Sequence, residues 1–333
     1  MPGKDFVIVD NATEPGGSWQ HMWPGLRLFS PSTFSSLPGW MMPTWNDAKH
    51  GYPPRSHVVD YLTRYEERYE LGVRRPWLAT AVNRETGQGE LTVTSNARSI
   101  SARFVVSATG TWTAPFWPTY PGMPTFEGRQ LHAADYHGPA EFVGQHVVVV
   151  GGGNSAAQIL AEVSQAAVTT WVSSRPPRFL PDDVDGRDLF MAATARVKAL
   201  NEGREHSGVG GLGDIVMVPT VVDARDRGAL KAEPMFTRLD HSGIVWSDGA
   251  REHADAVIWC TGFRPSLRHL RSLQLRKSRG YTPVGGPAGT RVLDEDRLYL
   301  VGYGDGTGPA SATLIGVGRT ARDTVADILH RLD

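Results

Sequence analysis

The residues best suited to chemistry form a glycine-rich turn near the middle of the chain. His146 to Val150 is a valine-rich run, typical of a parallel strand buried on both faces. It leads into Gly151-Gly152-Gly153-Asn154-Ser155-Ala156, and the apolar spacing that follows predicts a helix. A second strand is predicted over Val168 to Ser173. This order of strand, glycine turn, helix and strand is the setting in which a G-x-G-x-x-[GA] pattern binds a dinucleotide.

The small residues of this turn have separate physical roles. Gly151 permits the tight turn, Gly153 lets backbone amides approach a pyrophosphate, and Ala156 allows the helix to pack closely on the strand. The helix begins with free amides and the positive end of its dipole, which attract phosphate. We therefore predict a phosphate site formed by Gly151, Gly153, Asn154, Ser155 and Ala156.

The end of the second predicted strand indicates which dinucleotide binds. Sites for NAD usually place an acid about 20 residues after the glycines, where it binds the ribose hydroxyls. This chain has Ser173-Ser174-Arg175 there instead. Because hydroxyls and a guanidinium suit a 2′-phosphate, Ser174 and Arg175 favour NADPH over NADH.

Two other predicted strands end in the same dipeptide. Residues 103–107 run into Ala108-Thr109-Gly110, and Val257 to Trp259 runs into Cys260-Thr261-Gly262. The likeness of the two ends suggests two related nucleotide-binding units.

The rest of the chain supplies a frame of strands and helices. Asp5 to Asp10 predicts a strand closed by an acid, followed by a turn over Glu14 to Trp19. Apolar residues at helical spacing predict a helix over 57–70 and a closing helix over 311–332. Seven of the ten tryptophans lie in the first 117 residues, which indicates either loop packing or an aromatic-lined pocket for a flat cofactor or apolar substrate.

Composition excludes several classes of function. The 333 residues carry 34 Lys and Arg against 35 Asp and Glu, so no basic excess is available to bind nucleic acid. No apolar run approaches the roughly 18 residues of a membrane span, and no signal peptide is expected, so we expect a cytoplasmic protein. The single cysteine, Cys260, excludes an intrachain disulfide and a Cys-x-x-Cys site. Asp182 to Gly186 lacks the bidentate acid of a calcium loop, so we predict a solvated turn and no metal site.

Taken in order, the motifs resemble those of the two-dinucleotide-binding flavoproteins, and among these the flavin-containing monooxygenases. Residues Phe126 to Tyr136 fit that family's Phe-x-Gly-x-x-x-His-x-x-x-aromatic signature, with His132 as the histidine. Five further pieces occur in family order: Gly16 to Trp19, Ala108 to Gly110, the turn at Gly151, Cys260 to Phe263, and the segment from Gly302 into the last helix.

The resemblance implies an α/β fold with two dinucleotide-binding domains. Residues 1–125 and 265–333 would form an FAD-type domain, and residues 126–264 an inserted NADPH-binding domain. NADPH would reduce FAD, and a flavin hydroperoxide would then oxygenate a small nucleophilic substrate. The signature ends in Tyr136-His137 where Baeyer–Villiger enzymes have Trp followed by Pro or Asp, which favours heteroatom over ketone oxygenation. The oligomeric state is left open between a monomer and a homo-oligomer.

The resemblance also implies the roles of individual residues. Asp10 would bind the FAD ribose, Gly16 to Trp19 would line its phosphate and flavin side, and Gly304 and Asp305 would face the ribityl chain or ring. His132 would orient NADPH or couple domain movement, unless it is a buried core histidine. Besides the phosphate turn, Ser174 and Arg175, the implied cofactor-binding set is Asp10, Gly16, Gly17, Ser18, Trp19, Thr109, Gly110, Thr261, Gly262, Gly304 and Asp305.

The N-terminus departs from the family pattern. Family members begin with a strand, a G-x-G-x-x-G turn and a helix that grip the FAD pyrophosphate, roughly 30 residues ahead of the ribose-binding acid. Here Asp10 takes the place of that acid and nine residues precede it. We expect the loss of the first strand to expose apolar edges and to remove the phosphate cradle. A truncated start, a partner fragment that supplies the piece, and loss of tight FAD binding all stay open.

Three alternatives concern function. Phe179 to Gly186, Gly211 to Val216 and Gly304 to Ala310 are similar to the branch encoded beside arsenic-resistance genes, which implies an arsenical or a similar soft nucleophile. A thiol-disulfide reductase acting through bare flavin would share the fold without a cysteine pair. A flavin-deficient NADPH-binding module would explain the missing first glycine motif.

Overall fold

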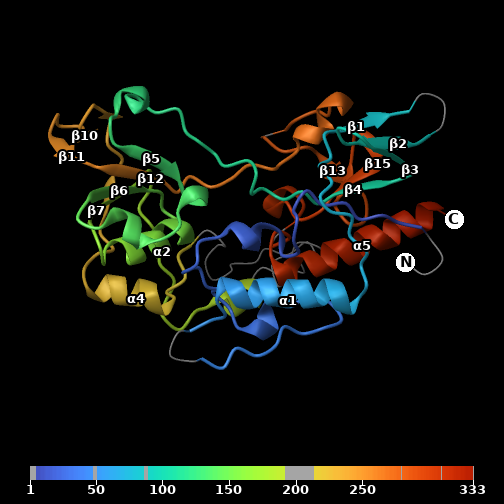
Figure 1. Ribbon diagram of the computed structural model, residues 1–333, viewed down its shortest axis with the longest axis horizontal. Coiled ribbons are helices and arrows are strands. Elements are labelled where there is room, and N and C mark those ends of the chain that lie inside the picture. The colour runs from blue at the N-terminus through green and yellow to red at the C-terminus, as the bar shows by residue number, and fades with distance from the viewer. Residues whose placement is uncertain are drawn as a thin grey trace, which may run out of the picture.

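The computed structural model describes residues 5–47, 51–85, 89–191, 214–278, 280–308 and 310–332. It has a mixed α/β fold in two lobes, each built around its own sheet and joined by two long connections (Figure 1). Within the described residues, no helix is both long enough and apolar enough to span a membrane.

The first lobe contains a five-stranded parallel sheet. Its strands, in spatial order, are β5 (Arg129–His132), β12 (Ala256–Trp259), β6 (His146–Val150), β7 (Val168–Ser173) and β8 (Ala232–Pro234). The helices α2 (Asn154–Val163) and α4 (Pro219–Asp226) cover one face. A small antiparallel sheet of β9 (Arg238–Leu239), β10 (Gly243–Val245) and β11 (Arg251–His253) covers the other.

Side chains alternate between the two faces of this sheet. Val147 and Val149 pack with the helices, whereas Val148 and Val150 pack against the small sheet. Burial on both faces explains why the strand is a continuous apolar run rather than an alternating one.

The second lobe contains the chain ends. The strands β13 (Val284–Gly285), β14 (Arg291–Val292), β15 (Glu295–Leu300) and β4 (Val105–Ser107) form one sheet, in which β15 and β4 are parallel. An antiparallel sheet of β1 (Ala81–Arg84), β2 (Leu91–Thr94) and β3 (Ser99–Ala102) packs beside it through Val82, Leu91 and Leu298. The helices are α1 (Arg55–Arg68) and α5 (Leu314–Leu332).

Short 3₁₀ helices occupy several turns between these elements. They are η1 (Gly17–His21), η2 (Ser32–Phe34), η4 (Met123–Thr125), η5 (Ala133–Asp135), η6 (Pro139–Phe142), η7 (Arg268–Leu273) and η8 (Gly304–Gly306).

The two connections between the lobes pair with each other. Pro115 and Phe263 form an antiparallel bridge, and Arg264 N–H donates to Ala114 O at 2.8 Å. Phe116 N–H donates to Gly262 O at 2.9 Å. The lobes are therefore joined by a paired ribbon that begins just after the two Thr-Gly dipeptides.

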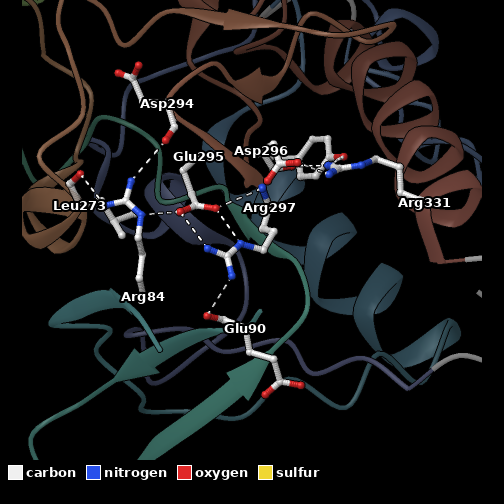
Figure 2. A network of polar contacts seen from close by, with 9 residues as sticks. Arg84, Glu90, Leu273, Asp294, Glu295, Asp296, Arg297 and Arg331 are labelled. Atoms are coloured by element: carbon white, nitrogen blue, oxygen red, sulfur yellow. Dashed lines mark hydrogen bonds and ion pairs between the residues drawn. The ribbon is translucent and has the colours of Figure 1, made fainter. Parts of the chain in front are cut away.

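A buried carboxylate, Glu295, ties the β1–β2–β3 sheet to β15. Glu295 lies between the guanidinium groups of Arg84 and Arg297, with Nε–carboxylate distances of 2.7 and 2.8 Å (Figure 2). The same two arginines also donate to the backbone oxygens of Leu273, Asp294 and Glu90. Two charge-assisted contacts thus compensate the desolvation of Glu295.

Most predicted elements are present within two or three residues of their predicted ends. The helix predicted over 57–70 is α1 at Arg55–Arg68, and the closing helix predicted over 311–332 is α5 at Leu314–Leu332. The strand predicted over 5–10 is wrong. These residues are extended but form only one parallel bridge, between Val9 and Arg74.

Residues 5–10 do not form a strand because they have no neighbouring strand among the described residues. Phe6 and Val7 are 57% and 44% exposed, and β4 lies at the edge of its sheet with Val106 46% exposed. Apolar side chains are therefore open at both places.

Part of the N-terminal region packs on the first lobe. Trp23 belongs to the core beneath the parallel sheet, and Leu26, Phe29 and Tyr52 pack against that core. Tyr52 Oη donates to Asp185 Oδ2 at 2.7 Å. The domain limits at 125/126 and 264/265 remain a prediction.

Candidate active site

The predicted phosphate turn lies where parallel strands end together. Parallel pairing sets Val150 beside Trp259 and Val172, so the segments that follow β6, β12 and β7 share one edge of the sheet. Ligands of open α/β sheets bind at this carboxyl edge. The glycine turn, Thr261-Gly262 and Ser174-Arg175 are thereby brought together from three parts of the chain.

Gly151 is required by close backbone approach. Its φ is +141°, and a Cβ there would lie 2.5 Å from Cys260 O. A Cβ on Gly152 would lie only 3.4 Å from Ser173 Cβ and 3.6 Å from Arg175 O. The turn therefore runs directly against the end of β7, where the predicted 2′-phosphate site is located.

The N-terminus of α2 offers backbone amides to an anion. Its N-cap residue is Gly153, which has no side chain to cap the helix. The first helical hydrogen bond runs from Ala157 N–H to Gly153 O. The amides of Asn154, Ser155 and Ala156 thus remain available to a phosphate among the described residues.

The Asn154 side chain has another task. Its Nδ2 donates to Asp214 O and its Oδ1 accepts from Val216 N–H, both at 2.9 Å. Only its backbone amide is therefore left for the predicted phosphate, and the side chain holds the 214–216 segment against the helix.

Arg175 follows β7 and is exposed, as is Ser174. Ser173 Oγ donates to Arg175 O at 2.7 Å, which fixes the turn that carries them. Within the described residues, no ion pair engages the Arg175 guanidinium. It is therefore available to an anionic ligand beside the glycine turn.

Asp10, in the second lobe, belongs to a charged triad. Arg75 Nε donates to Asp10 Oδ2 at 2.9 Å, and the two Arg75 terminal nitrogens donate to the carboxylate of Glu66 on α1. Asp10 Oδ1 accepts from Ala12 N–H at 3.1 Å. Hydrogen bonds to both carboxylates, chiefly to Glu66, outweigh burial and raise the pKa of Arg75. The hydrogen bonds from Arg75 and from Ala12 N–H orient the Asp10 side chain.

The turn at Gly16 and Gly17 is held from α1. Both glycines have positive φ, +110° and +55°, and a Cβ on Gly17 would meet no heavy atom within 4 Å. Arg55 donates to Trp19 O at 2.7 Å and to Gln20 O. The η1 backbone is therefore fixed while Gly17 stays open on one side.

The two Thr-Gly dipeptides have the same kind of hydrogen bonding and backbone conformation. The hydroxyls of Thr109 and Thr261 donate to Ser266 O and Phe116 O, so both side chains are committed within the protein. Gly110 and Gly262 have φ of +65° and +76°, and nothing lies within 4 Å of a Cβ on either. The glycine backbones, rather than the threonine hydroxyls, are what a cofactor could approach.

His132 is fully buried at the start of the connections. Its Nδ1 accepts from Ala134 N–H at 3.0 Å, so the proton is on Nε2, which donates to Gly262 O at 3.0 Å. Burial lowers its pKa more than the hydrogen bond to Gly262 raises it, which keeps the ring neutral. His132 thus links β5 to the connection at Gly262, and both of its ring nitrogens are engaged within the protein.

Several of the N-terminal aromatic residues gather at the same junction. His21 stacks on Trp112 with centroids 6.0 Å apart, and Trp112 stacks on Phe263 at 5.3 Å. Phe263 meets the His132 ring edge to face at 5.0 Å. A row of rings therefore lines the place where the two connections leave the lobes.

Gly304 follows β15 and begins η8, where its carbonyl accepts from Thr307 N–H and Ser311 Oγ. The Asp305 side chain lies outside the described part of the structure, as do residues 211–213 of the narrower resemblance.

The Cys260 thiol is neutral, and two carboxylates of the acidic turn are paired within the protein. Burial raises the pKa of the Cys260 thiol to about 12, which leaves it a neutral and weakly reactive group. Asp182 pairs with Arg225, and Asp185 accepts from Tyr52 Oη. No cluster of three or more metal-ligating side chains occurs among the described residues.

Sequence reasoning missed the residues that hold the site from a distance. Arg55 and Arg75 come from or beside α1, and Tyr303 and His269 reach Thr109 and Ser107 through hydrogen bonds. No local pattern marks these four residues, because the site residues that they hold are between 35 and 196 positions away.

Comparison with known proteins bears on the family to which the chain belongs. A family model described as pyridine nucleotide-disulphide oxidoreductase matches residues 2–185. A flavin-containing monooxygenase structure from Stenotrophomonas maltophilia is 46% identical, with a TM-score of 0.89, covering 99% of this chain and 92% of that chain.

Two curated relatives show weaker similarity over most of the chain. An uncharacterized oxidoreductase, CzcO-like, from Geobacillus kaustophilus is 28% identical over 98% of this chain and 91% of its own length. Indole-3-pyruvate monooxygenase YUCCA1 from Oryza sativa subsp. japonica is 25% identical over 90% of this chain and 81% of its own. The chain therefore belongs to the pyridine nucleotide-disulphide oxidoreductase family and, within it, to the flavin-containing monooxygenases.

Proposed function

We propose that this protein is an NADPH-dependent flavoprotein monooxygenase that oxygenates a small nucleophilic heteroatom. The observation that carries the proposal is the anion site at the carboxyl edge of the parallel sheet. There the open N-terminus of α2 lies beside the exposed Arg175, which no ion pair engages within the described ranges, in a chain of the flavin-containing monooxygenase family.

The residues of the second lobe fit FAD in part. Asp10 is an oriented carboxylate suited to ribose hydroxyls, and Gly17, Gly110 and Gly262 leave backbone open to a flat ring. The described residues ahead of Asp10 are extended chain and supply no helix N-terminus for the pyrophosphate. When bound, FAD would accept a hydride from NADPH and pass electrons to oxygen.

The chain's own residues would place the two cofactors and exclude water. Arg75 and Arg55 hold the ribose-side carboxylate and the Gly16–Gly17 turn, and His132 ties β5 to the connection at Gly262. The ring row from His21 to Phe263 gives the junction an apolar lining. An apolar junction suits a reaction in which water must be kept from the reduced cofactor.

The function is tested by following the oxygen atom. Protein supplied with FAD and NADPH is given a thioether and, in parallel, a trivalent organoarsenical under ¹⁸O₂. One NADPH should be oxidised per sulfoxide formed, and the sulfoxide should carry one ¹⁸O, the second oxygen atom leaving as water. Preference for the arsenical would support the narrower substrate class. NADPH oxidation that yields only hydrogen peroxide with every nucleophile would contradict the proposal.

A second candidate function is a flavin-deficient NADPH-binding module. The exposed Phe6 and Val7 and the open edge of β4 favour it. The described residues ahead of Asp10 offer no helix N-terminus to the FAD pyrophosphate, whereas the N-terminus of α2 and Arg175 are open to an anion. Tight NADPH binding with no FAD binding under any condition would establish this candidate. The reductase alternative would have to act without Cys260, since the pKa of that thiol is raised to about 12.

A further inference from the structure

A network of hydrogen-bonded polar side chains runs from the buried His269, Ser107 and Tyr303 to the exposed Thr109. His269 Nε2 is 3.0 Å from Ser107 Oγ, which is 2.8 Å from Tyr303 Oη. Tyr303 Oη is in turn 2.8 Å from Thr109 Oγ1, which donates to Ser266 O at 2.7 Å. His269 lies in η7, Ser107 ends β4, Thr109 follows β4, and Tyr303 lies in the turn between β15 and η8.

The number of available protons fixes which group donates in every hydrogen bond of this network. Thr109 has one hydroxyl proton, and Ser266 O can only accept it, so Thr109 Oγ1 must accept from Tyr303. Because the Tyr303 hydroxyl proton is donated to Thr109, Tyr303 Oη must accept from Ser107, as it does from Thr109 N–H at 3.1 Å. Ser107 has likewise spent its proton, so His269 must donate from Nε2.

Burial keeps both titratable members neutral. Desolvation lowers the pKa of His269 and raises that of Tyr303, the latter more than its hydrogen bonds lower it. His269 therefore carries its proton on Nε2 and has an unprotonated Nδ1, and each hydroxyl gives one hydrogen bond and accepts at least one.

The chain of bonds ends on the turn that the proposed function places beside FAD. Thr109 is held by its amide and by its hydroxyl, and Ser266 N–H donates back to Gly110 O at 2.9 Å. No heavy atom lies within 4 Å of a Cβ on Gly110. The turn is thus held by hydrogen bonds, and the space next to Gly110 is open.

We propose that Tyr303, aligned by Ser107 and His269, is a positioning residue that holds the Thr109-Gly110 backbone in place for the flavin. This inference rests on the proposed function for the identity of the ligand, but not for the existence of the hydrogen-bonded chain. All hydrogen bonds of the network point in one direction, so the loss of any one donor leaves the next acceptor unsatisfied.

The first experiment needs no cofactor. In Tyr303→Phe, the Thr109 amide loses its acceptor, so its hydrogen exchange, measured at single-residue resolution, should be about fivefold faster or more. Tyr299→Phe is the matched control, because Tyr299 is an equally buried phenol of β15 whose hydroxyl donates to Asp327 and not to this turn. Faster exchange at Thr109 in Tyr303→Phe alone supports the proposal. Unchanged exchange overturns it.

The position of the proton on the His269 ring provides an independent test. The ¹⁵N spectrum of histidine-labelled protein should show His269 protonated on Nε2, and a ring protonated on Nδ1 alone would overturn the proton count. His269→Gln retains an N–H donor and should keep slow exchange at Thr109, whereas His269→Leu should not. Equal hydrogen exchange at Thr109 in His269→Gln and His269→Leu would also contradict the proposed hydrogen-bond network.

The last arm brings in the flavin. Tyr303→Phe should weaken FAD binding by about fivefold, with NADPH affinity unchanged, whereas Tyr299→Phe should change neither. If the wild-type chain binds no FAD, the proposed function fails, while the exchange and tautomer results still decide whether Tyr303 positions the turn. Equal loss of FAD affinity in both phenylalanine variants would reduce Tyr303 to a general packing role.

Discussion

Replacing Glu295 by alanine is expected to lower the free energy of unfolding by about 3 kcal/mol, at the low end of the range for a broken buried ion pair. The side chain of Glu295 is 3% exposed and receives hydrogen bonds from Arg84 and Arg297 (Figure 2). Its removal leaves two guanidinium groups without their carboxylate. The low end applies because Arg84 and Arg297 keep part of their contact with water, at 45% and 22% exposure.

The neighbouring residue supplies the control. Asp296 lies beside Glu295 in β15 and pairs with Arg331, but its side chain is 66% exposed. Asp296→Ala should cost about 1 kcal/mol or less, as is usual for exposed pairs. Urea unfolding of both variants measures the difference. Equal losses would show that burial of Glu295 does not decide its contribution.

The same carboxylate predicts a pH dependence. Burial alone would raise the pKa of Glu295, but the hydrogen bonds from Arg297 and Arg84 outweigh it and lower the pKa. Its stabilising contribution is therefore complete above the unfolded-state pKa of about 4.3 and is lost as the pH falls through the lower folded-state value. In Glu295→Ala this part of the acid sensitivity should be absent.

Replacing Arg175 by alanine should weaken NADPH binding by roughly 10- to 100-fold, the worth of a charge-assisted hydrogen bond to phosphate. NADH has no 2′-phosphate, so its affinity should change by less than about twofold. Fluorescence titration with each dinucleotide gives the ratio. Arg178→Ala is the matched control, because it removes the same charge three residues away on a 76% exposed side chain.

The outcome that contradicts this role is specific. Equal losses for NADPH and NADH in Arg175→Ala would mean that Arg175 contacts no 2′-phosphate. An Arg178→Ala effect as large as that of Arg175→Ala would show that overall positive charge, rather than one contact, governs affinity.

The parts of the fold that sequence could predict are those whose cause is local. The valine run, the glycine turn and the helix periodicity all lie between His146 and Ser173, and β6, α2 and β7 form where these patterns place them. Gly151 is marked by its own type, because a close backbone approach tolerates no side chain.

What sequence could not predict depends on distant partners. Residues 5–10 have the composition of a strand but pair at only one residue, since a strand exists only with a neighbour. Asn154 fits a phosphate motif, yet its side chain is used by Val216, 62 residues later. Tyr303 reaches Thr109 across 194 residues, and nothing in either local sequence indicates that contact.

Binding and reduction of FAD by this chain is the central claim, and a visible absorbance spectrum tests it most directly. The purified 333-residue protein is measured with and without added FAD, and then with NADPH in the absence of oxygen. We expect a bound flavin spectrum that NADPH bleaches and that returns when oxygen is admitted. No bound flavin under any condition, or bound flavin that NADPH leaves oxidised, would contradict a flavin monooxygenase and leave an NADPH-binding module as the function of the chain.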